Sequence, residues 1–116
     1  MGTFFHPITL ATDTGSETVE ALADTGSTFT TLPSALLERL GVQPHRTIRL
    51  RLADGRVQER PVGRVHAQLN GVDDEILCVF GTEDSVPTIG AHTLETFLLG
   101  VDPDRHRLVP VEGWWA

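Results

Sequence analysis

Turn-forming residues recur at short intervals in this chain and confine most of it to short strands. Asp54-Gly55 is the strongest two-residue hairpin signal, Asn70-Gly71 marks a second tight turn, and Asp13-Thr14-Gly15-Ser16 has the same turn chemistry. Between the turns, apolar residues alternate with polar ones, as from Ile48 to Leu52, which is typical of a half-buried strand. The pattern predicts a mainly β protein.

Two short segments predict helices instead of strands. Ser34–Leu40 follows Pro33 and stops at Gly41, and Ala91–Leu99 is followed by Gly100. Proline at the start and glycine just past the end are common helix boundaries. The remaining apolar segments predict strands over residues 3–12, 19–23, 48–52, 57–69, 75–81 and 108–111.

Length and charge limit the possible organisation and partners. With 116 residues the chain is expected to form a single domain, residues 1–116. A net charge of -7 repels a phosphate backbone, so nucleic acid is not an expected partner. No apolar run approaches the roughly 20 residues that span a bilayer, and the N-terminus lacks a signal-peptide pattern. We therefore expect no membrane contact and a cytoplasmic location.

The sequence gives no sign of a metal or cofactor. The histidines are scattered without the spacing of paired ligands, and no glycine run could cradle a phosphate. Cys78 has no partner for an internal disulfide and lies in an apolar segment, where a thiol acts as a small buried hydrophobe. The alternation of Arg49 and Arg51 with apolar residues is most simply the solvated face of a strand.

One carboxylate stands out because a strand leads directly to it. Asp24-Thr25-Gly26-Ser27 follows the apolar run Val19–Ala23, so the acid lies where a strand enters a tight turn that glycine permits. Asp13 starts a similar tetrapeptide, but it precedes a strand. If residues 16–23 are extended, the two aspartates lie roughly 25 Å apart. Asp13 is thus expected to be a turn residue, and Asp24 the candidate catalytic acid.

The chain resembles the retropepsin-like aspartic proteases of clan AA, in particular their small bacterial single-domain members. The resemblance rests on residues 23–27 with Thr31-Leu32-Pro33 behind them, on the hairpin at Asp54-Gly55, and on Pro87-Thr88-Ile89-Gly90-Ala91 before the second helix. It extends to Val101-Asp102-Pro103 and to residues 107–110. The resemblance implies a closed, mainly antiparallel barrel with one or two short helices, in which the apolar-glycine segment packs beneath the acid loop. It also implies a twofold homodimer.

Residue type suggests roles around Asp24. Gly26 should let a backbone N–H approach the carboxylate, and Ser27 could donate a hydrogen bond to its outer oxygen. By the resemblance, Thr25 would hydrogen-bond across the dimer axis. An ordinary turn is the alternative interpretation of these three residues.

Two further segments are candidate substrate contacts. Ala53, Asp54 and Gly55 would form the tip of a flap that closes over a peptide, although an exposed hairpin without a task has the same turn residues. Ile89 would line the floor of the cleft, or else belong to the core.

Peptide hydrolysis by carboxylates needs one ionised and one protonated group, and this chain offers one strand-delivered acid. Two copies of Asp24 on a twofold axis would supply both, because carboxyls about 3 Å apart share a proton. The sequence thus predicts a homodimeric aspartic endopeptidase acting on peptides or proteins. The alternatives are a catalytically silent dimerisation or peptide-binding module of the same fold, and a small-molecule binding barrel. Trp114 and Trp115 would contribute to the dimer interface or pack back on their own subunit.

Overall fold

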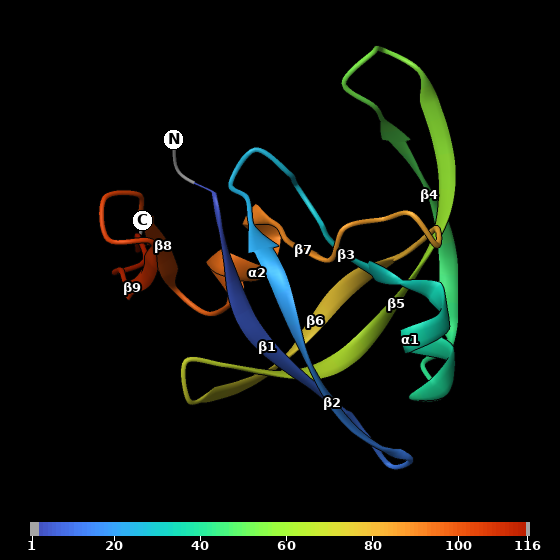
Figure 1. Cartoon of the computed structure of the whole chain (residues 1–116), viewed down its shortest axis with the longest axis horizontal. Helices are drawn as coiled ribbons and strands as arrows, with labels where there is room; N and C mark the ends of the chain where they lie inside the picture. The colour runs from blue at the N-terminus through green and yellow to red at the C-terminus, as the bar shows by residue number, and fades with distance from the viewer. Residues whose placement is uncertain (1–2, 116) are drawn as a thin grey trace.

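The computed structural model describes residues 3–115, and most of them lie in strands (Figure 1). Two short helices, α1 (Ser34–Arg39) and α2 (Ala91–Thr96), lie where the sequence predicts helices. The strands are β1 (Phe4–Thr12), β2 (Gly15–Ala23), β3 (Thr30–Pro33), β4 (Pro44–Arg51), β5 (Val57–Leu69), β6 (Val72–Gly81), β7 (Thr88–Ile89), β8 (Leu99–Asp102) and β9 (Arg107–Pro110). The mainly β prediction is confirmed.

Seven strands form one sheet in the order β1-β2-β7-β3-β6-β5-β4, and β1 pairs with β5 as well. β8 and β9 form a separate two-stranded sheet, on the opposite side of the molecule from α1 (Figure 1). Most strand pairs are antiparallel, as expected of a mainly antiparallel sheet, but β2 pairs with β7 and β3 pairs with β6 in parallel. Both pairings join strands that are distant in the sequence, and the alternation of apolar residues does not encode strand direction.

All three predicted turns are present, but the loop at Asp54-Gly55 is longer than predicted. Asp13 and Thr14 connect β1 to β2, since Thr12 pairs with Gly15. Asn70 and Gly71 connect β5 to β6, and both have positive φ angles, 51° and 79°, as a primed hairpin turn requires.

The Asp54-Gly55 turn is not the predicted two-residue loop. The Leu52 N–H donates to the Arg56 carbonyl at 2.7 Å, so the loop contains three residues, 53–55. Gly55 has a φ of 90° and completes the loop in the left-handed region, which is the common solution for three-residue hairpins.

The second helix is shorter than predicted. α2 ends at Thr96, and Leu98 turns the chain with a φ of 54° before Leu99 begins β8. Gly100 therefore lies inside a strand, paired with Val109, and does not cap the helix. A Cβ at Gly100 would lie 2.9 Å from Val111 Cγ1, so close packing explains this glycine.

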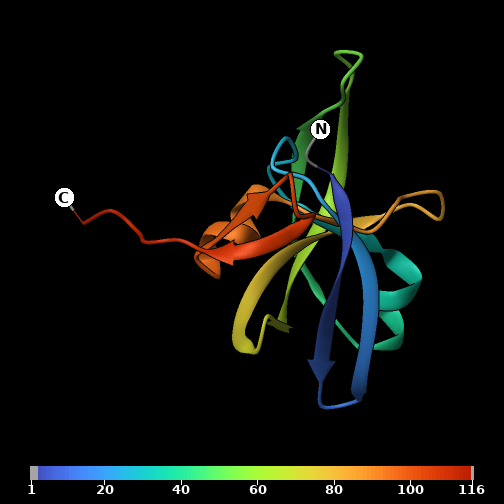
Figure 2. The same cartoon turned by 60° about the vertical axis from the view of Figure 1, so that its left-hand side comes forward.

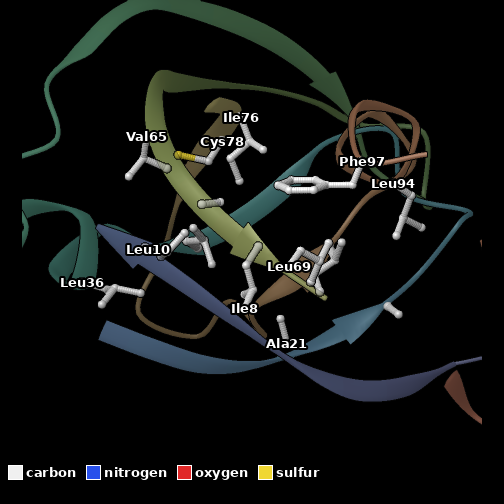
Figure 3. Packing of buried hydrophobic residues seen from close by; sticks show 14 of the residues in the cluster. Ile8, Leu10, Ala21, Leu36, Val65, Leu69, Ile76, Cys78, Leu94 and Phe97 are labelled. Atoms are coloured by element: carbon white, nitrogen blue, oxygen red, sulfur yellow. The ribbon is translucent and has the colours of Figure 1, made fainter. Parts of the chain in front are cut away.

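The core lies between the β1–β2 and β5–β6 hairpins and extends to both helices (Figure 3). Ile8 and Leu10 of β1 and Leu69 and Ile76 of the second hairpin are almost fully buried. Cys78 is in this cluster, and burial raises the pKa of its thiol to about 12. The prediction of a buried, structural Cys78 is confirmed.

Among residues 3–115, no helix has the length and apolar character needed to cross a membrane.

Candidate active site

Asp24 follows β2 directly, and its half-buried carboxylate is fixed by the loop that it begins. Asp24 Oδ1 accepts a hydrogen bond from the Gly26 N–H at 2.9 Å, and the Ser27 N–H donates to the Asp24 carbonyl at 3.2 Å. The expected approach of a backbone N–H at Gly26 is present. Among the described residues no cation pairs with Asp24.

Backbone hydrogen bonds tie the acid loop to the segment β7–α2. The Asp24 N–H donates to the Ile89 carbonyl at 3.0 Å. The first amides of α2, at Ala91 and His92, donate to the carbonyls of Ser27 and Thr28 at 2.7 and 2.9 Å. These amides have no partner within their own helix, so the acid loop satisfies the helix start. The apolar-glycine segment packs beneath the loop, as the family resemblance implies.

A buried pair of hydroxyls reinforces this connection. Thr30 Oγ1 and Thr93 Oγ1 lie 2.6 Å apart, and the Gly90 N–H donates to Thr30 Oγ1 at 3.1 Å. Both threonine side chains are fully buried. Sequence analysis missed this pair, because Thr30 stands among several threonines and no local pattern marks the one that turns inward.

Gly90 is required by the close approach of two backbones. A Cβ at this position would lie 2.4 Å from the Phe29 carbonyl oxygen and 2.8 Å from that of Ser27. The signal for this role was present in the sequence as a glycine between an apolar residue and a helix start.

Ser27 does not have its predicted role, and Ile89 has one of its two predicted roles. The Ser27 hydroxyl donates to the Phe29 carbonyl at 3.2 Å instead of the Asp24 carboxylate, because that acceptor is next to it in the turn. Ile89 is fully buried in the core cluster, which is the second of the two roles that the sequence left open, and its carbonyl accepts a hydrogen bond from the Asp24 N–H. Thr25 is exposed beside the acid.

A cleft of about 490 Å³ lies beside the acid loop. One wall consists of residues 26–29 with Thr31, and the other of residues 49–52 with Val79. Sequence analysis missed that Arg49 and Arg51 border this cleft, because the strand pattern alone placed them on a solvated face.

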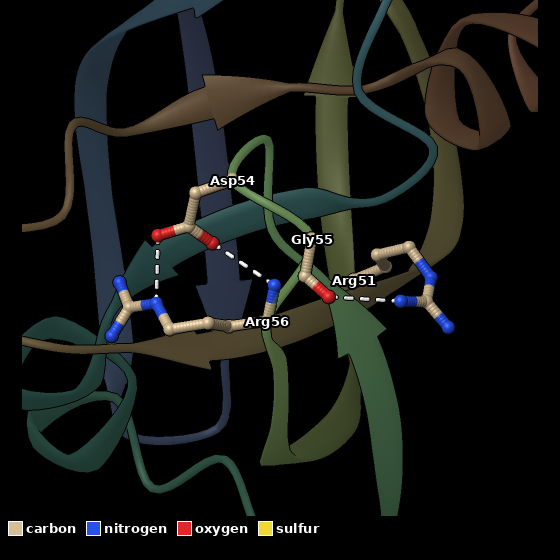
Figure 4. Close-up of polar contacts among 4 residues, drawn as sticks. All are labelled: Arg51, Asp54, Gly55 and Arg56. Atoms are coloured by element: carbon tan, nitrogen blue, oxygen red, sulfur yellow. Dashed lines mark hydrogen bonds and ion pairs between the residues drawn. The ribbon is translucent and has the colours of Figure 1, made fainter.

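The predicted flap tip is exposed and braced by its own residues (Figure 4). Asp54 accepts hydrogen bonds from the Arg56 N–H at 3.0 Å and from Arg56 Nε at 2.7 Å. Arg51 Nη1 donates to the Gly55 carbonyl at 2.8 Å. Ala53, Asp54 and Gly55 lie beyond the residues that line the cleft, at the far end of the β4–β5 hairpin (Figure 1).

Asp13 lies at the opposite end of β2 from Asp24, in the β1–β2 turn. The nine-residue strand between them spans about 30 Å. The two aspartates of one chain therefore cannot share a proton, and the prediction that Asp13 is a turn residue is confirmed. The described residues contain no group of three or more potential metal ligands.

Comparisons with known proteins agree with this geometry. The sequence pattern of the family described as aspartyl protease matches residues 6–102. The solution structure of the simian foamy virus (mac) protease is similar in fold, with a TM-score of 0.54 at 18% sequence identity. That match covers 79% of this chain and 94% of the viral chain. No curated protein matches the sequence. Since the family pattern covers most of the chain, this protein belongs to the aspartyl protease family and has a retropepsin-like fold.

Proposed function

We propose that this protein is an aspartic endopeptidase that works as a homodimer, with Asp24 of each copy forming the catalytic pair. The observation that carries the proposal is the fixed carboxylate at the end of β2, held by the Gly26 N–H and free of any cation among the described residues. In this role residues 1–116 act as a single domain. The pairing of β1 with both β2 and β5 supports a sheet that closes as a retropepsin-type barrel.

The mechanism needs two carboxyl groups in different protonation states. When two carboxyls lie about 3 Å apart, both cannot be ionised, so one proton is shared and the pair titrates as a unit. The ionised member takes a proton from the attacking water, and the protonated member polarises the scissile carbonyl and then assists the departing amine. Twofold symmetry makes the two residues equivalent until an asymmetric peptide binds.

The remaining site residues support this reaction. Gly26 orients the carboxylate, Thr25 contacts the partner loop across the axis, and Ser27 stiffens the turn through the Phe29 carbonyl. The flap tip, with Ala53, Asp54 and Gly55, closes over the peptide and excludes water. Ile89 supports Asp24 from beneath, because its carbonyl accepts a hydrogen bond from the Asp24 N–H.

The C-terminal segment supports the dimer. It extends away from the rest of the molecule after β9 (Figure 2), and the side chains of Trp114 and Trp115 are 102% and 98% exposed. The two indoles therefore do not pack on their own subunit. Two fully exposed indoles are costly in water, and their burial against a second copy would stabilise the dimer by about 1.5 to 3 kcal/mol each.

The deciding experiment is cleavage of an unstructured protein between pH 3 and 7 by wild type and by Asp24→Asn. We expect Asp24→Asn to lose about 10²- to 10⁴-fold in kcat/KM. Asp13→Asn is the matched control, because it changes the same residue type in the same tetrapeptide, and it should cleave like wild type. Equal cleavage by wild type and Asp24→Asn would refute the proposal, and binding without cleavage by wild type would favour the silent module.

The dimer has a separate test. The specific activity should rise with protein concentration, and excess Asp24→Asn should inhibit wild type by forming mixed dimers. Specific activity that is independent of concentration in a monomeric sample would contradict a shared site.

A further inference from the structure

The charges of this acidic chain are strongly segregated. Six of the nine arginines but only two of the sixteen acidic residues lie in the β4–β5 hairpin, residues 44–69. The hairpin therefore carries a net charge of +4 and the rest of the chain -11, with histidines neutral. A cationic hairpin beside a cleft attracts an anionic ligand toward that cleft.

β4 also has a free edge. It is the last strand of the sheet and pairs with β5 alone among the described strands. Residues 49–52 all line the cleft beside the acid loop. Successive side chains of a strand point to opposite faces, so a cleft that contacts four consecutive residues reaches the backbone here as well as the side chains of one face. An exposed edge of this kind binds extended peptides by adding a strand.

The two faces of β4 next to that edge differ in chemistry. On one face, Leu50 packs with Phe29 and Val79 in a small apolar cluster. On the other face lie Arg49 and Arg51, both with exposed side chains. Side chains of an added strand would alternate between these two faces.

The arginines can accept a new carboxylate. Arg49 lies 3.6 Å from Glu59, but the two side chains are 71% and 63% exposed, so the pair is weak and can be exchanged. Arg51 uses Nη1 for the Gly55 carbonyl, which leaves other guanidinium donors for a ligand.

We propose that the substrate is an extended peptide segment that pairs with the free edge of β4, with acidic side chains facing Arg49 and Arg51 and apolar side chains facing Leu50 and Phe29. This inference rests on the proposed endopeptidase function and adds the substrate class. The apolar face and the free strand edge favour a peptide, because the side chains of an extended peptide alternate between two faces. The phosphates of a nucleic acid form a continuous charged backbone and have no apolar groups between them.

Binding tests the preference without relying on cleavage. Labelled peptides with alternating X and apolar residues, where X is Glu, Gln or Lys, are titrated into full-length Asp24→Asn at pH 6, where a Glu side chain in a peptide is ionised. Two arginine contacts should make the Glu peptide bind about three- to tenfold more tightly than the Gln peptide. The Lys peptide should bind most weakly, and the Glu preference should shrink in 1 M salt.

Substitutions test whether Arg49 and Arg51 cause the preference for the Glu peptide. Adding Arg49→Gln and Arg51→Gln should reduce the Glu to Gln affinity ratio to about one. The matched control, Arg64→Gln with Arg105→Gln, makes the same change in net charge at two exposed arginines that do not line the cleft, and it should keep the ratio. A ratio that survives loss of Arg49 and Arg51, or no preference before their loss, would overturn the proposal.

Two further probes test the alternation and the ligand class. A peptide of the same composition with its Glu residues in one block should bind more weakly than the alternating peptide. Equal binding of the block peptide, or of a single-stranded DNA oligonucleotide of the same charge, would show a general polyanion surface and overturn the inference.

Cleavage of the same peptides by wild type separates the two proposals. Equal cleavage of Glu and Gln peptides, with Asp24→Asn inactive, would refute the acidic preference and leave the endopeptidase standing. Preferential binding of the Glu peptide without cleavage by wild type would support the peptide site and refute the endopeptidase.

Discussion

The acid loop and the flap tip are both short turns of polar residues, but they are held in different ways. The acid loop is fixed by backbone hydrogen bonds from Asp24, Ala91 and His92 that join residues more than 60 positions apart. The flap tip is held by Asp54, Arg51 and Arg56, which contact residues within the same short loop.

These two kinds of contact make the acid loop the rigid region and the flap tip the movable one. The acid loop cannot open without breaking contacts to the core, whereas the flap tip can change position without disturbing any buried group. A catalytic pair needs fixed geometry, and a cover over the substrate needs mobility. Substitutions at the acid loop should therefore cost more stability than substitutions at the flap tip.

Gly90→Ala should separate the acid loop from the segment β7–α2. The new Cβ would lie 2.4 Å from the Phe29 carbonyl oxygen, so two backbones must separate. We expect the free energy of unfolding to fall by about 3 kcal/mol or more, measured by urea denaturation. Gly15→Ala is the control, since nothing lies within 4 Å of its Cβ position and its stability should change little. Equal effects at both glycines would contradict the close approach.

Thr30→Val tests the buried hydroxyl pair. It leaves the Gly90 N–H and the Thr93 hydroxyl without their partner in the core, at a cost of about 1–3 kcal/mol in unfolding free energy. Thr93→Val should cost less, because the Gly90 N–H keeps its acceptor. A double-mutant cycle should show coupling between the two threonines, and simple additivity would show that the pair does not act as a unit.

The stability at alkaline pH depends on Cys78, which is buried in the core beside the acid loop. Its pKa is raised by burial from 9.0 to about 12, so between these values the unfolded thiol loses its proton while the folded one keeps it. Stability is therefore full below pH 9 and falls by roughly 1 kcal/mol by pH 10. The chain has no lysine or tyrosine to titrate in this range. Cys78→Ala should remove the pH dependence, and a slope that persists in this variant would assign it to another cause.

Asp54→Ala should have the smallest effect on stability. The contacts that it removes are exposed and local, so the free energy of unfolding should change by less than about 1 kcal/mol. Activity should suffer more than stability, with a lower kcat/KM in the peptide assay, because a loosened tip closes less well over the substrate. A large loss of stability would show that the flap tip is part of the folded core.

The sequence predicted those features that depend on neighbours along the chain. The hairpins, the start of both helices, the burial of Cys78 and the position of Asp24 after a strand all follow from local turn chemistry and alternation. Features set by distant contacts were not predictable in this way. The parallel pairing of β2 with β7, the inward turn of Thr30 and the early end of α2 depend on strands and side chains remote in sequence. Gly100 was misinterpreted for the same reason, since it fits a strand against Val111.

The exposed tail has a practical consequence for spectroscopy. Both tryptophans of the chain lie there, at positions 114 and 115, and the sequence contains no tyrosine. Because these fluorophores are already solvated in the isolated subunit, intrinsic emission will report little when the subunit unfolds. A blue shift on concentration would instead read out association of the tail with another molecule, which makes the native chromophores a label-free sensor of assembly.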